Sequence, residues 1–228
     1  MLSIVVPVLN EAAIVEAALG RLQPLRARGA EVIVVDGGSG DGTPERAAPL
    51  ADRLAAAPPG RARQMNGGAA LAQGDVLLFL HADTILPDGA DRLIAGALVE
   101  RGRAWGRFDV RIDGRNPGLR LVAAMMNWRS WLSGIATGDQ AIFVRRHAFE
   151  AVGGFPDIPL MEDIALSGAL KRFGRPARIR RRVTTSGRRW DENGLARTIL
   201  LMWRLRLAFY FGADPARLAA RYGYGRYD

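Results

Sequence analysis

The sequence predicts an α/β fold with a mostly parallel sheet and helices on both of its faces. Short β-branched runs recur in the first part of the chain, and segments with helical spacing or helix-start residues lie between them. Strands that alternate with helices in this way form parallel sheets, whose ligands bind at the carboxyl ends of the strands. The strands expected are residues 2–8, 31–36 and 75–80, with a weaker one at 53–57.

Cap residues and apolar spacing predict the helices. Asn10 is expected to cap one helix that runs to Arg28, and Thr43 caps a second one, with Pro44 at its first position. A third helical stretch covers residues 64–72. In the second half of the chain we expect helices over residues 88–101 and 116–132, and strands over residues 104–112 and 138–144.

Length and composition set the domain organisation. The 228 residues are 49% hydrophobic, which suits one domain with a sizeable core. We interpret residues 1–84 as one functional half, 85–190 as the other, and 191–228 as a C-terminal helical segment. The chain has no cysteine, which excludes disulfides, thiolate metal sites and cysteine nucleophiles and favours a reducing cytoplasm.

The formal net charge of +9 comes almost entirely from arginine, because Lys171 is the only lysine. Arginine favours bidentate contact with phosphate or carboxylate, although a biased overall composition gives the same count. A basic nucleic-acid-binding module is therefore one hypothesis. The basic residues are scattered and no nucleic-acid-binding motif is present, so we expect no nucleic-acid partner.

No segment has the features of a signal peptide or of a membrane-spanning helix. Met1 opens directly on a strand-like run, and Arg204 and Arg206 interrupt the longest apolar stretch. Residues 195–211 combine arginines with large apolar side chains, a composition typical of interfacial helices. Peripheral contact with the inner face of the cell membrane and packing on the domain or in a homodimer are both compatible with this composition.

Two segments near the expected strand ends have the residues of a nucleotide site. Asp36 lies in a glycine-rich loop directly after a strand, where its carboxylate suits a base or a ribose, and a plain turn would look similar. The loop lacks the spacing of dinucleotide-binding and Walker motifs. The basic helix entry at residues 60–66 suggests that Arg63 and Asn66 approach a diphosphate, with a solvated basic turn as the alternative.

Acidic residues further along the chain suggest metal-assisted sugar transfer. Such chemistry needs one carboxylate to hold a cation on a diphosphate and another to take a proton from the acceptor. Asp83 follows the expected strand at residues 75–80, and Glu162 and Asp163 come about eighty positions later. A helix that begins with acidic residues to complement its dipole is the structural alternative for the later pair.

Motifs across residues 2–190 resemble those of the family 2 glycosyltransferases, in the order of that family. The pattern is most similar to the small bacterial transferases found beside radical-SAM and selenium-related genes. The matching segments are residues 3–11, 35–43, 74–83, 138–143, 153–155 and 162–163.

This resemblance implies a GT-A fold and an inverting transfer from a nucleotide sugar, often one of uridine diphosphate. Asp163 is then the base, and Asp83 ligates Mg²⁺ or Mn²⁺ on the diphosphate. Glu162 is expected to point towards an acceptor hydroxyl or a structural partner, and the matched motif that contains Asp139 and Gln140 contributes to substrate binding. The residues expected to line the nucleoside pocket are Pro7, Asn10, Glu11 and Asp36.

The chain departs from the family pattern at two places. His81 stands where the usual Asp-x-Asp motif has its first aspartate, and imidazole suits Mn²⁺ better than Mg²⁺, so either His81 is a ligand or only Asp83 is. Ser186 replaces the glutamine of a Gln-x-x-Arg-Trp segment, but Arg189 and Trp190 remain to contact an acceptor or a diphosphate. Synthases with that segment carry membrane helices, so we expect one sugar per acceptor here.

A nucleotidyltransferase acting on a sugar phosphate is the nearest enzymatic alternative. It would use a similar sheet, a nucleotide and a metal. Such enzymes typically have a glycine-rich segment directly after the first strand, whereas this chain has residues 7–11 there. Release of pyrophosphate rather than a nucleoside diphosphate would identify it. The sequence leaves the acceptor open, as a small molecule or a lipid-linked one.

Overall fold

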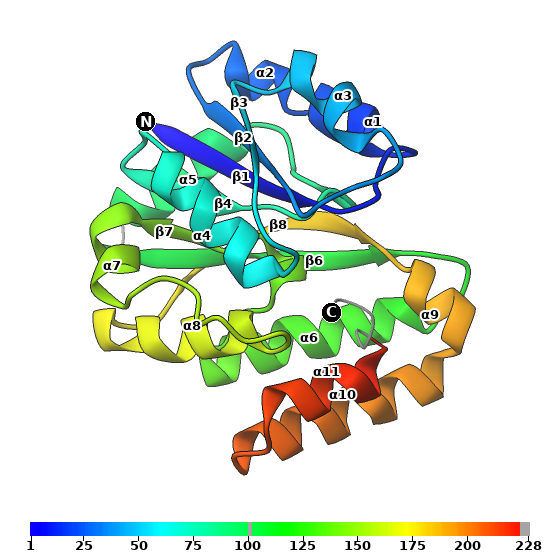
Figure 1. Ribbon diagram of the computed structural model, residues 1–228. Helices are drawn as coiled ribbons and strands as arrows, with labels where there is room; N and C mark the ends of the chain where they lie inside the picture. The colour runs from blue at the N-terminus through cyan, green and yellow to red at the C-terminus, as the bar shows by residue number, and fades with distance from the viewer. Residues whose placement is uncertain (100–101, 224–228) are drawn as a thin grey trace.

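The computed structural model describes residues 1–99 and 102–223, built around one eight-stranded sheet (Figure 1). The strand order is β3-β2-β1-β4-β7-β6-β8-β5. The strands are β1 (Leu2–Val8), β2 (Glu31–Asp36), β3 (Arg53–Ala56), β4 (Val76–Phe79), β5 (Thr84–Ile85), β6 (Trp105–Asp113), β7 (Phe143–Arg145) and β8 (Ala177–Ser186).

The predicted parallel arrangement holds for the first half of the chain and weakens in the second. β3, β2, β1 and β4 are parallel neighbours. β7 is antiparallel to both β4 and β6, while β8 is parallel to β6 and antiparallel to β5. The sheet is therefore of the mixed α/β type, with its parallel part formed by the amino-terminal strands.

Helices cover both faces of the sheet, as predicted. Alternation along β1 sends Ile4 and Val6 to one hydrophobic core and Val5 to another on the opposite face. The helices are α1 (Val15–Gly20), α2 (Gln23–Arg26), α3 (Thr43–Ala47), α4 (Arg61–Leu71), α5 (Ala90–Val99), α6 (Leu119–Ser133), α7 (Arg146–Ala151), α8 (Glu162–Leu170), α9 (Arg188–Asn193), α10 (Leu195–Tyr210) and α11 (Pro215–Tyr222), with short 3-10 turns η1 (Ala48–Leu50), η2 (Gly138–Gln140) and η3 (Lys171–Phe173).

The prediction of a single helix from Asn10 to Arg28 is wrong. Two short helices, α1 and α2, occupy this stretch, because Pro24 has no N–H to offer the preceding turn. Asn10 does not cap α1: its φ is 54°, a left-handed conformation that asparagine tolerates better than most residues. Its side chain instead accepts a hydrogen bond from the N–H of Gly40, at 3.0 Å.

The prediction of a continuous strand over residues 138–144 is also wrong. Residues 138–140 form η2, and Ala141 has a φ of 48°, which interrupts extended geometry. The strand β7 begins only at Phe143. The apolar residues of this segment are buried because the turn packs inside the protein, and burial alone does not distinguish a turn from a strand.

The C-terminal helices α10 and α11 form a third, smaller core with the segment before α8. Leu205 and Leu218 are buried there together with Leu160 and Met161. The predicted helix over residues 195–211 is confirmed, and one of its faces packs on the domain. Within residues 1–99 and 102–223, no helix is both long and apolar enough to cross a bilayer.

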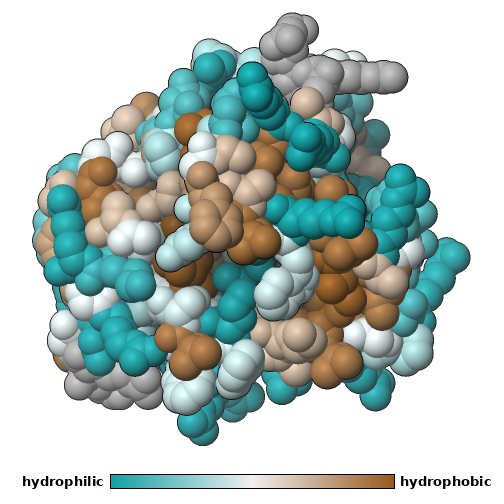
Figure 2. Space-filling view, turned by 90° about the horizontal axis from the view of Figure 1, so that it is seen from below, coloured by the Kyte–Doolittle hydropathy of each residue, from teal (hydrophilic) through white to brown (hydrophobic). Residues whose placement is uncertain are grey.

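The outer faces of α6 and α10 expose large apolar side chains. Figure 2, which views the molecule from the side of these helices, shows apolar clusters separated by hydrophilic side chains. α10 contains three arginines and no acidic residue, so the apolar groups stand among positive charges. The exposed apolar residues are Leu121, Met125, Trp128, Trp131 and Leu132 on α6, and Leu200, Trp203, Leu207, Tyr210 and Phe211 on or just after α10.

Candidate active site

A gap between β1 and β4 begins at the carboxyl end of the parallel strands. The β1–β4 pairing ends at Val5↔Phe79, while β1 stays paired with β2 as far as Val8. The carbonyl of Val5 accepts a hydrogen bond from Leu80 on the β4 side, so Pro7, two residues later, faces the same side. Because β4 has ended there, the missing N–H of Pro7 breaks no ladder bond. Ligands of parallel sheets bind at such openings.

Asp36 organises the glycine-rich loop that follows β2. Its carboxylate accepts hydrogen bonds from the N–H groups of Gly38 and Ser39, at 2.8 and 2.9 Å, and from the hydroxyl of Ser39. The side chain is buried. In the structure Asp36 therefore fixes the shape of the loop, and contact with a nucleoside remains a prediction.

Residues 10 and 11 join this loop from the end of β1. The N–H of Asn10 donates to the Ser39 hydroxyl, and the N–H of Glu11 donates to the Thr43 hydroxyl, both at 2.8 Å. The Glu11 carboxylate is half-buried near other charged groups: burial and the negative charge of Asp83 raise its pKa, while Arg188 lowers it. These charges place residues from β1, β4–β5 and α9 within electrostatic reach of one another.

Gln64 on α4 is a structural residue that the sequence analysis did not identify as such. Its buried side-chain amide donates to the carbonyls of Val8 and Val35, at 2.7 and 2.9 Å. It also lies against Gly37, where a Cβ atom would come 3.0 Å from the amide nitrogen. Gln64 thus ties together the ends of β1 and β2, next to the loop that they position.

The predicted diphosphate contacts, Arg63 and Asn66, bind a neighbouring loop in the structure. Arg63 forms an ion pair with Asp157 at 2.9 Å, and the Asn66 amide exchanges two hydrogen bonds with the backbone of Phe155. Their contact with a ligand stays a prediction. Arg61, at the start of the same helix, lies closer to the acidic groups, since its charge lowers the pKa of Glu11 and of Glu162.

Asp83 lies at the point where the chain crosses from β4 to the far edge of the sheet. Thr84 pairs with Thr185 in the β5–β8 ladder, which places Asp83 beside Ser186 at the start of the predicted Ser-Gly-Arg-Arg-Trp segment. Arg189 in that segment stacks on Tyr222, with its guanidinium carbon 4.0 Å from the ring centroid.

Trp190 differs from its neighbour Arg189 in its surroundings. Its side chain is partly buried and packs against the core on one face of the sheet. Arg188, which the sequence analysis did not single out, is exposed and acts electrostatically on Glu11. The segment therefore reaches the opening through Arg188, while substrate contacts of Arg189 and Trp190 remain predictions.

The imidazole of His81 packs against η2. Its Nδ1 lies 3.7 Å from a carboxylate oxygen of Asp139, and its ring fills the space that a Cβ atom on Gly138 would need. Asp139 is partly exposed beside it. Gln140 is wholly buried and its side-chain oxygen accepts a hydrogen bond from the N–H of Thr137, so we expect it to influence a substrate only through the turn.

The residues near Asp83 could hold a divalent cation only if a bound substrate supplied further ligand atoms. In the part of the chain that the structure describes, no group of three or more His, Cys, Asp or Glu residues could hold a metal ion. A Mg²⁺ site in a nucleotide enzyme often takes one or two carboxylates and completes its shell with phosphate oxygens and water. Asp83, with His81 as the second candidate, matches that partial set.

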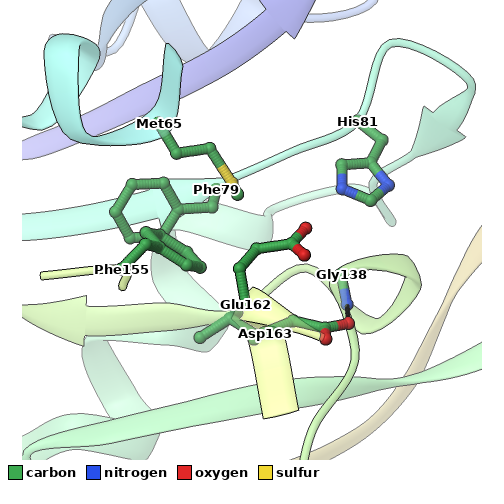
Figure 3. Close-up of a pocket in the computed structure, with 8 residues that line it drawn as sticks. Met65, Phe79, His81, Gly138, Phe155, Glu162 and Asp163 are labelled. Carbon is green, nitrogen blue, oxygen red and sulfur yellow. Dashed lines mark hydrogen bonds between the residues drawn. The ribbon is translucent and has the colours of Figure 1, made fainter. Parts of the chain in front are cut away.

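Glu162 and Asp163 begin α8 and point in different directions (Figure 3). Asp163 accepts hydrogen bonds from the N–H groups of Gly138 and Ile164, at 2.8 and 2.7 Å, which fix its carboxylate beside η2. Glu162 is buried beside a cavity of about 10 Å³, room for one water molecule. Burial and the charge of Asp163 raise the pKa of Glu162 to about 7.

Two further arginines act on Asp163 from helices that the motifs did not include. Burial, together with the nearby charge of Arg206, lowers the pKa of Arg129 on α6 to about 10, and the charge of Asp163 opposes this shift. Burial also lowers the pKa of Arg206 on α10, and Asp163 and Asp139 raise it. No sequence signal marks these residues, because only the packing of α6 and α10 brings them together.

The comparisons with known proteins agree with this arrangement. The profile described as Glycosyl transferase family 2 matches residues 3–153, and the chain belongs to that family. No curated protein sequence matches the chain.

Solved structures with a similar fold come from glycosyltransferases of several organisms. Glucosyl-3-phosphoglycerate synthase from Mycobacterium tuberculosis, in complex with Mn²⁺, uridine diphosphate and glucosyl-3-phosphoglycerate, is 21% identical with a TM-score of 0.64, over 98% of this chain and 80% of that one. Mannosyltransferase PcManGT from Pyrobaculum calidifontis, with GDP-Man and Mn²⁺, is 19% identical with a TM-score of 0.62, over 100% of this chain and 64% of that one. S. aureus TarS 1-349 with UDP-GlcNAc is 16% identical with a TM-score of 0.65, over 81% of this chain and 58% of that one. The chain thus spans less than two thirds of the last two proteins, and the likeness confirms the predicted fold.

Proposed function

We propose that this family 2 glycosyltransferase moves one sugar from a nucleotide sugar to an acceptor hydroxyl with inversion of the anomeric centre. The observation that carries the proposal is the fixed carboxylate of Asp163, held by two backbone N–H groups beside the opening at the strand ends. The structurally similar proteins were crystallised with uridine diphosphate, UDP-GlcNAc or GDP-Man, which supports a nucleotide-sugar donor.

The donor half is assigned to residues 1–84 and the acceptor half to residues 85–190. The nucleoside would lie over the loop that Asp36 organises, with Pro7, Asn10 and Glu11 at its edge. The diphosphate would extend towards Asp83, where Arg61 and Arg188 supply positive charge.

A divalent cation is proposed at Asp83, and two of the similar structures contain Mn²⁺. Bound there, Mg²⁺ or Mn²⁺ supplies positive charge to a departing diphosphate. His81 would either join the ligands directly or orient the turn that carries Asp139, since its Nδ1 lies 3.7 Å from that carboxylate.

Asp163 is proposed to take the proton of the acceptor hydroxyl. As the acceptor oxygen forms its bond to the anomeric carbon, the bond from that carbon to the diphosphate oxygen breaks, and the nucleoside diphosphate leaves on the opposite face. One displacement of this kind inverts the anomeric centre. Glu162, whose raised pKa favours a protonated side chain near neutrality, would hold a hydrogen bond rather than take the proton.

The test uses the donor alone, because the acceptor is unknown. We expect thermal stabilisation by a nucleoside diphosphate that requires Mn²⁺ or Mg²⁺. Slow hydrolysis of an α-linked nucleotide sugar should then release nucleoside diphosphate and a sugar that is initially β, observed by NMR. In a separate incubation with a nucleoside triphosphate and a sugar 1-phosphate, release of pyrophosphate would favour the nucleotidyltransferase alternative. An initially α sugar from the nucleotide sugar would exclude inversion.

We also propose peripheral contact with anionic lipid through the exposed faces of α6 and α10. The supporting observations are the exposed apolar side chains of Trp128 and Trp203 and the absence of acidic residues on α10. Sedimentation with anionic vesicles should retain the wild type at low salt and less of it at high salt, and Trp203→Glu should reduce retention. A protein that stays in the supernatant at both salt concentrations would point to a soluble acceptor.

The narrower resemblance to transferases found beside radical-SAM and selenium-related genes is likewise a proposal. It is supported by the motif order quoted above. Examination of the neighbouring genes would test it.

A further inference from the structure

Arg129 and Arg206 come from helices far apart in the sequence and meet beside the start of α8. The charge of Asp163 raises the pKa of both guanidinium groups, and the charge of Arg206 lowers that of Arg129. The packing of α10 explains this placement, because Leu205, next to Arg206, is buried with Met161 at the end of the segment that leads into α8.

The two arginines have hydrogen-bond donors without acceptors. The Nε and Nη2 atoms of Arg129 and the Nε atom of Arg206 are shielded from solvent, and no acceptor for them exists in residues 1–99 and 102–223. Buried donors are nearly always paired in folded proteins. Both groups stay charged at neutral pH, so the described structure holds two partly buried guanidinium groups that together have three shielded N–H donors without an acceptor.

The chemistry of guanidinium selects the ligand. Its planar set of N–H donors matches the oxygens of phosphate and carboxylate. Two such groups held together repel each other, and an oxyanion between them removes that repulsion while it accepts the unpaired hydrogen bonds.

The position of the pair separates it from the diphosphate of the donor. In a single displacement the nucleophile and its base lie on one side of the anomeric carbon and the leaving group lies on the other. Asp163, as the base, lies on the nucleophile side. Arg206 stands on this side because Leu205, beside it on α10, packs on Met161 at the start of α8, and the charge of Asp163 raises the pKa of both Arg206 and Arg129. Arg188 acts on Glu11 instead, and Arg61 acts on both Glu11 and Glu162.

We propose that Arg129 and Arg206 bind an anionic oxygen group, phosphate or carboxylate, of the acceptor, close to the hydroxyl that receives the sugar. The inference rests on the proposed function, because it takes the side of Asp163 as the acceptor side. It names the acceptor class as a hydroxyl compound with a phosphate or a carboxylate.

The first experiment measures anion binding to protein saturated with uridine diphosphate and Mn²⁺, so that the donor position is filled. Inorganic phosphate and acetate are titrated separately by calorimetry. We expect at least one of them to bind, and the tighter of the two identifies the acceptor group as phosphate or carboxylate. Arg129→Gln and Arg206→Gln should each weaken that binding by about tenfold or more.

The matched control is Arg204→Gln, an exposed arginine on the same helix as Arg206, which should leave anion binding unchanged. Equal binding by wild type and both variants would overturn the inference. So would a loss of uridine diphosphate affinity in Arg129→Gln or Arg206→Gln, because the pair would then belong to the donor. If uridine diphosphate with Mn²⁺ or Mg²⁺ fails to bind the wild type, the proposed function fails and the inference with it.

A second readout separates a binding role from a structural one. If the arginines wait for a ligand, Arg129→Met and Arg206→Met remove shielded N–H donors that have no acceptor, so the melting temperature of the free protein should stay the same or rise. The stabilisation that phosphate or acetate gives the wild type should disappear in these variants. A lower melting temperature in both variants with anion stabilisation intact would make the arginines structural and overturn the proposal.

Discussion

The loops after β1 and β2 and the helices around Asp163 form two sides of one opening, and their polar groups are arranged differently. On the β1–β2 side, Asp36 accepts hydrogen bonds from its own loop, and Gln64 donates hydrogen bonds to two carbonyls at the strand ends. On the other side, Arg129 and Arg206 keep unpaired donors and Glu162 is buried with a raised pKa. Polar groups that already have partners stabilise the conformation of the free protein. Unpaired polar groups can instead stabilise a complex, because a ligand supplies the missing hydrogen-bond partners.

The largest expected effect comes from Asp163→Asn, which removes the proton acceptor but keeps nearly the same size. Turnover should fall by about 10²- to 10⁴-fold, while affinity for the nucleoside diphosphate stays unchanged, because the donor side is untouched. Steady-state kinetics and calorimetry measure the two quantities. Asp157→Asn, at an exposed ion pair, serves as the control. Wild-type turnover in Asp163→Asn would show that another group is the base.

The second prediction concerns the metal, at the boundary of the two sides. Asp83→Ala should weaken binding of uridine diphosphate in Mn²⁺ or Mg²⁺ by about tenfold or more, and His81→Ala by less, because a carboxylate suits a hard cation better than imidazole does. Chelation of the metal should lower the wild-type affinity to that of the Asp83 variant. A larger loss at His81 would make the histidine the main ligand.

The third prediction tests how strongly the donor side depends on its internal hydrogen bonds. Gln64→Leu leaves the carbonyls of Val8 and Val35 without their buried donor, at a cost of about 1–3 kcal/mol in the free energy of unfolding. Urea denaturation measures the change. Gln73→Leu, an exposed glutamine just beyond the same helix, should cost little. Equal effects in the two variants would mean that Gln64 does not hold the strand ends together.

The fourth prediction concerns the pH dependence of stability through Glu162. Its pKa is raised from 4.5 to about 7, so the folded protein binds this proton more tightly than the unfolded chain does. The resulting stabilisation is fully present below pH 4.5 and is lost as the pH rises through about 7, with a slope of at most about 1.4 kcal/mol per pH unit.

Glu162→Gln should remove that slope, so the variant should gain stability relative to the wild type between pH 5 and pH 8. Urea denaturation of the metal-free protein at both pH values measures it. Glu16→Gln, at an exposed glutamate of α1, should leave the pH dependence as in the wild type. An unchanged slope in Glu162→Gln would show that another group causes the dependence.

The sequence predicted β1, β2 and β4 well, because each is a short apolar run that is mostly buried on both faces. It predicted β3 only weakly, and the residues of β3 alternate between partly buried and exposed. It missed β8, where arginines at positions 180–182 conceal the alternation. It also placed a strand over η2, since the buried residues of a turn have the same composition as those of a strand. Local pattern was sufficient where burial followed the strand period and failed where tertiary packing caused the burial.

For the candidate site, the motifs indicated residues in loops and at strand ends, such as Asp83 and Asp163, whose roles are proposals. They did not identify Gln64, which resembles any helix glutamine, or Arg129 and Arg206. These arginines stand among many others in the sequence. They differ from the other arginines of the site because some of their N–H groups have no hydrogen-bond acceptor in the described structure. Only the three-dimensional packing reveals this difference.

Met161, the residue before Glu162 and Asp163, has a φ of 72°, a conformation that costs a side-chain-bearing residue about 1–2 kcal/mol. Its side chain is buried in the small core with Leu205 and Leu218, and that burial offsets the cost. The packing of the C-terminal helices on Met161 thus stabilises the backbone conformation directly before Glu162 and Asp163. If α10 and α11 were removed, Met161 would be free to relax to a negative φ, and the direction of the Asp163 carboxylate would be lost even though every residue of the family motifs remained in the chain.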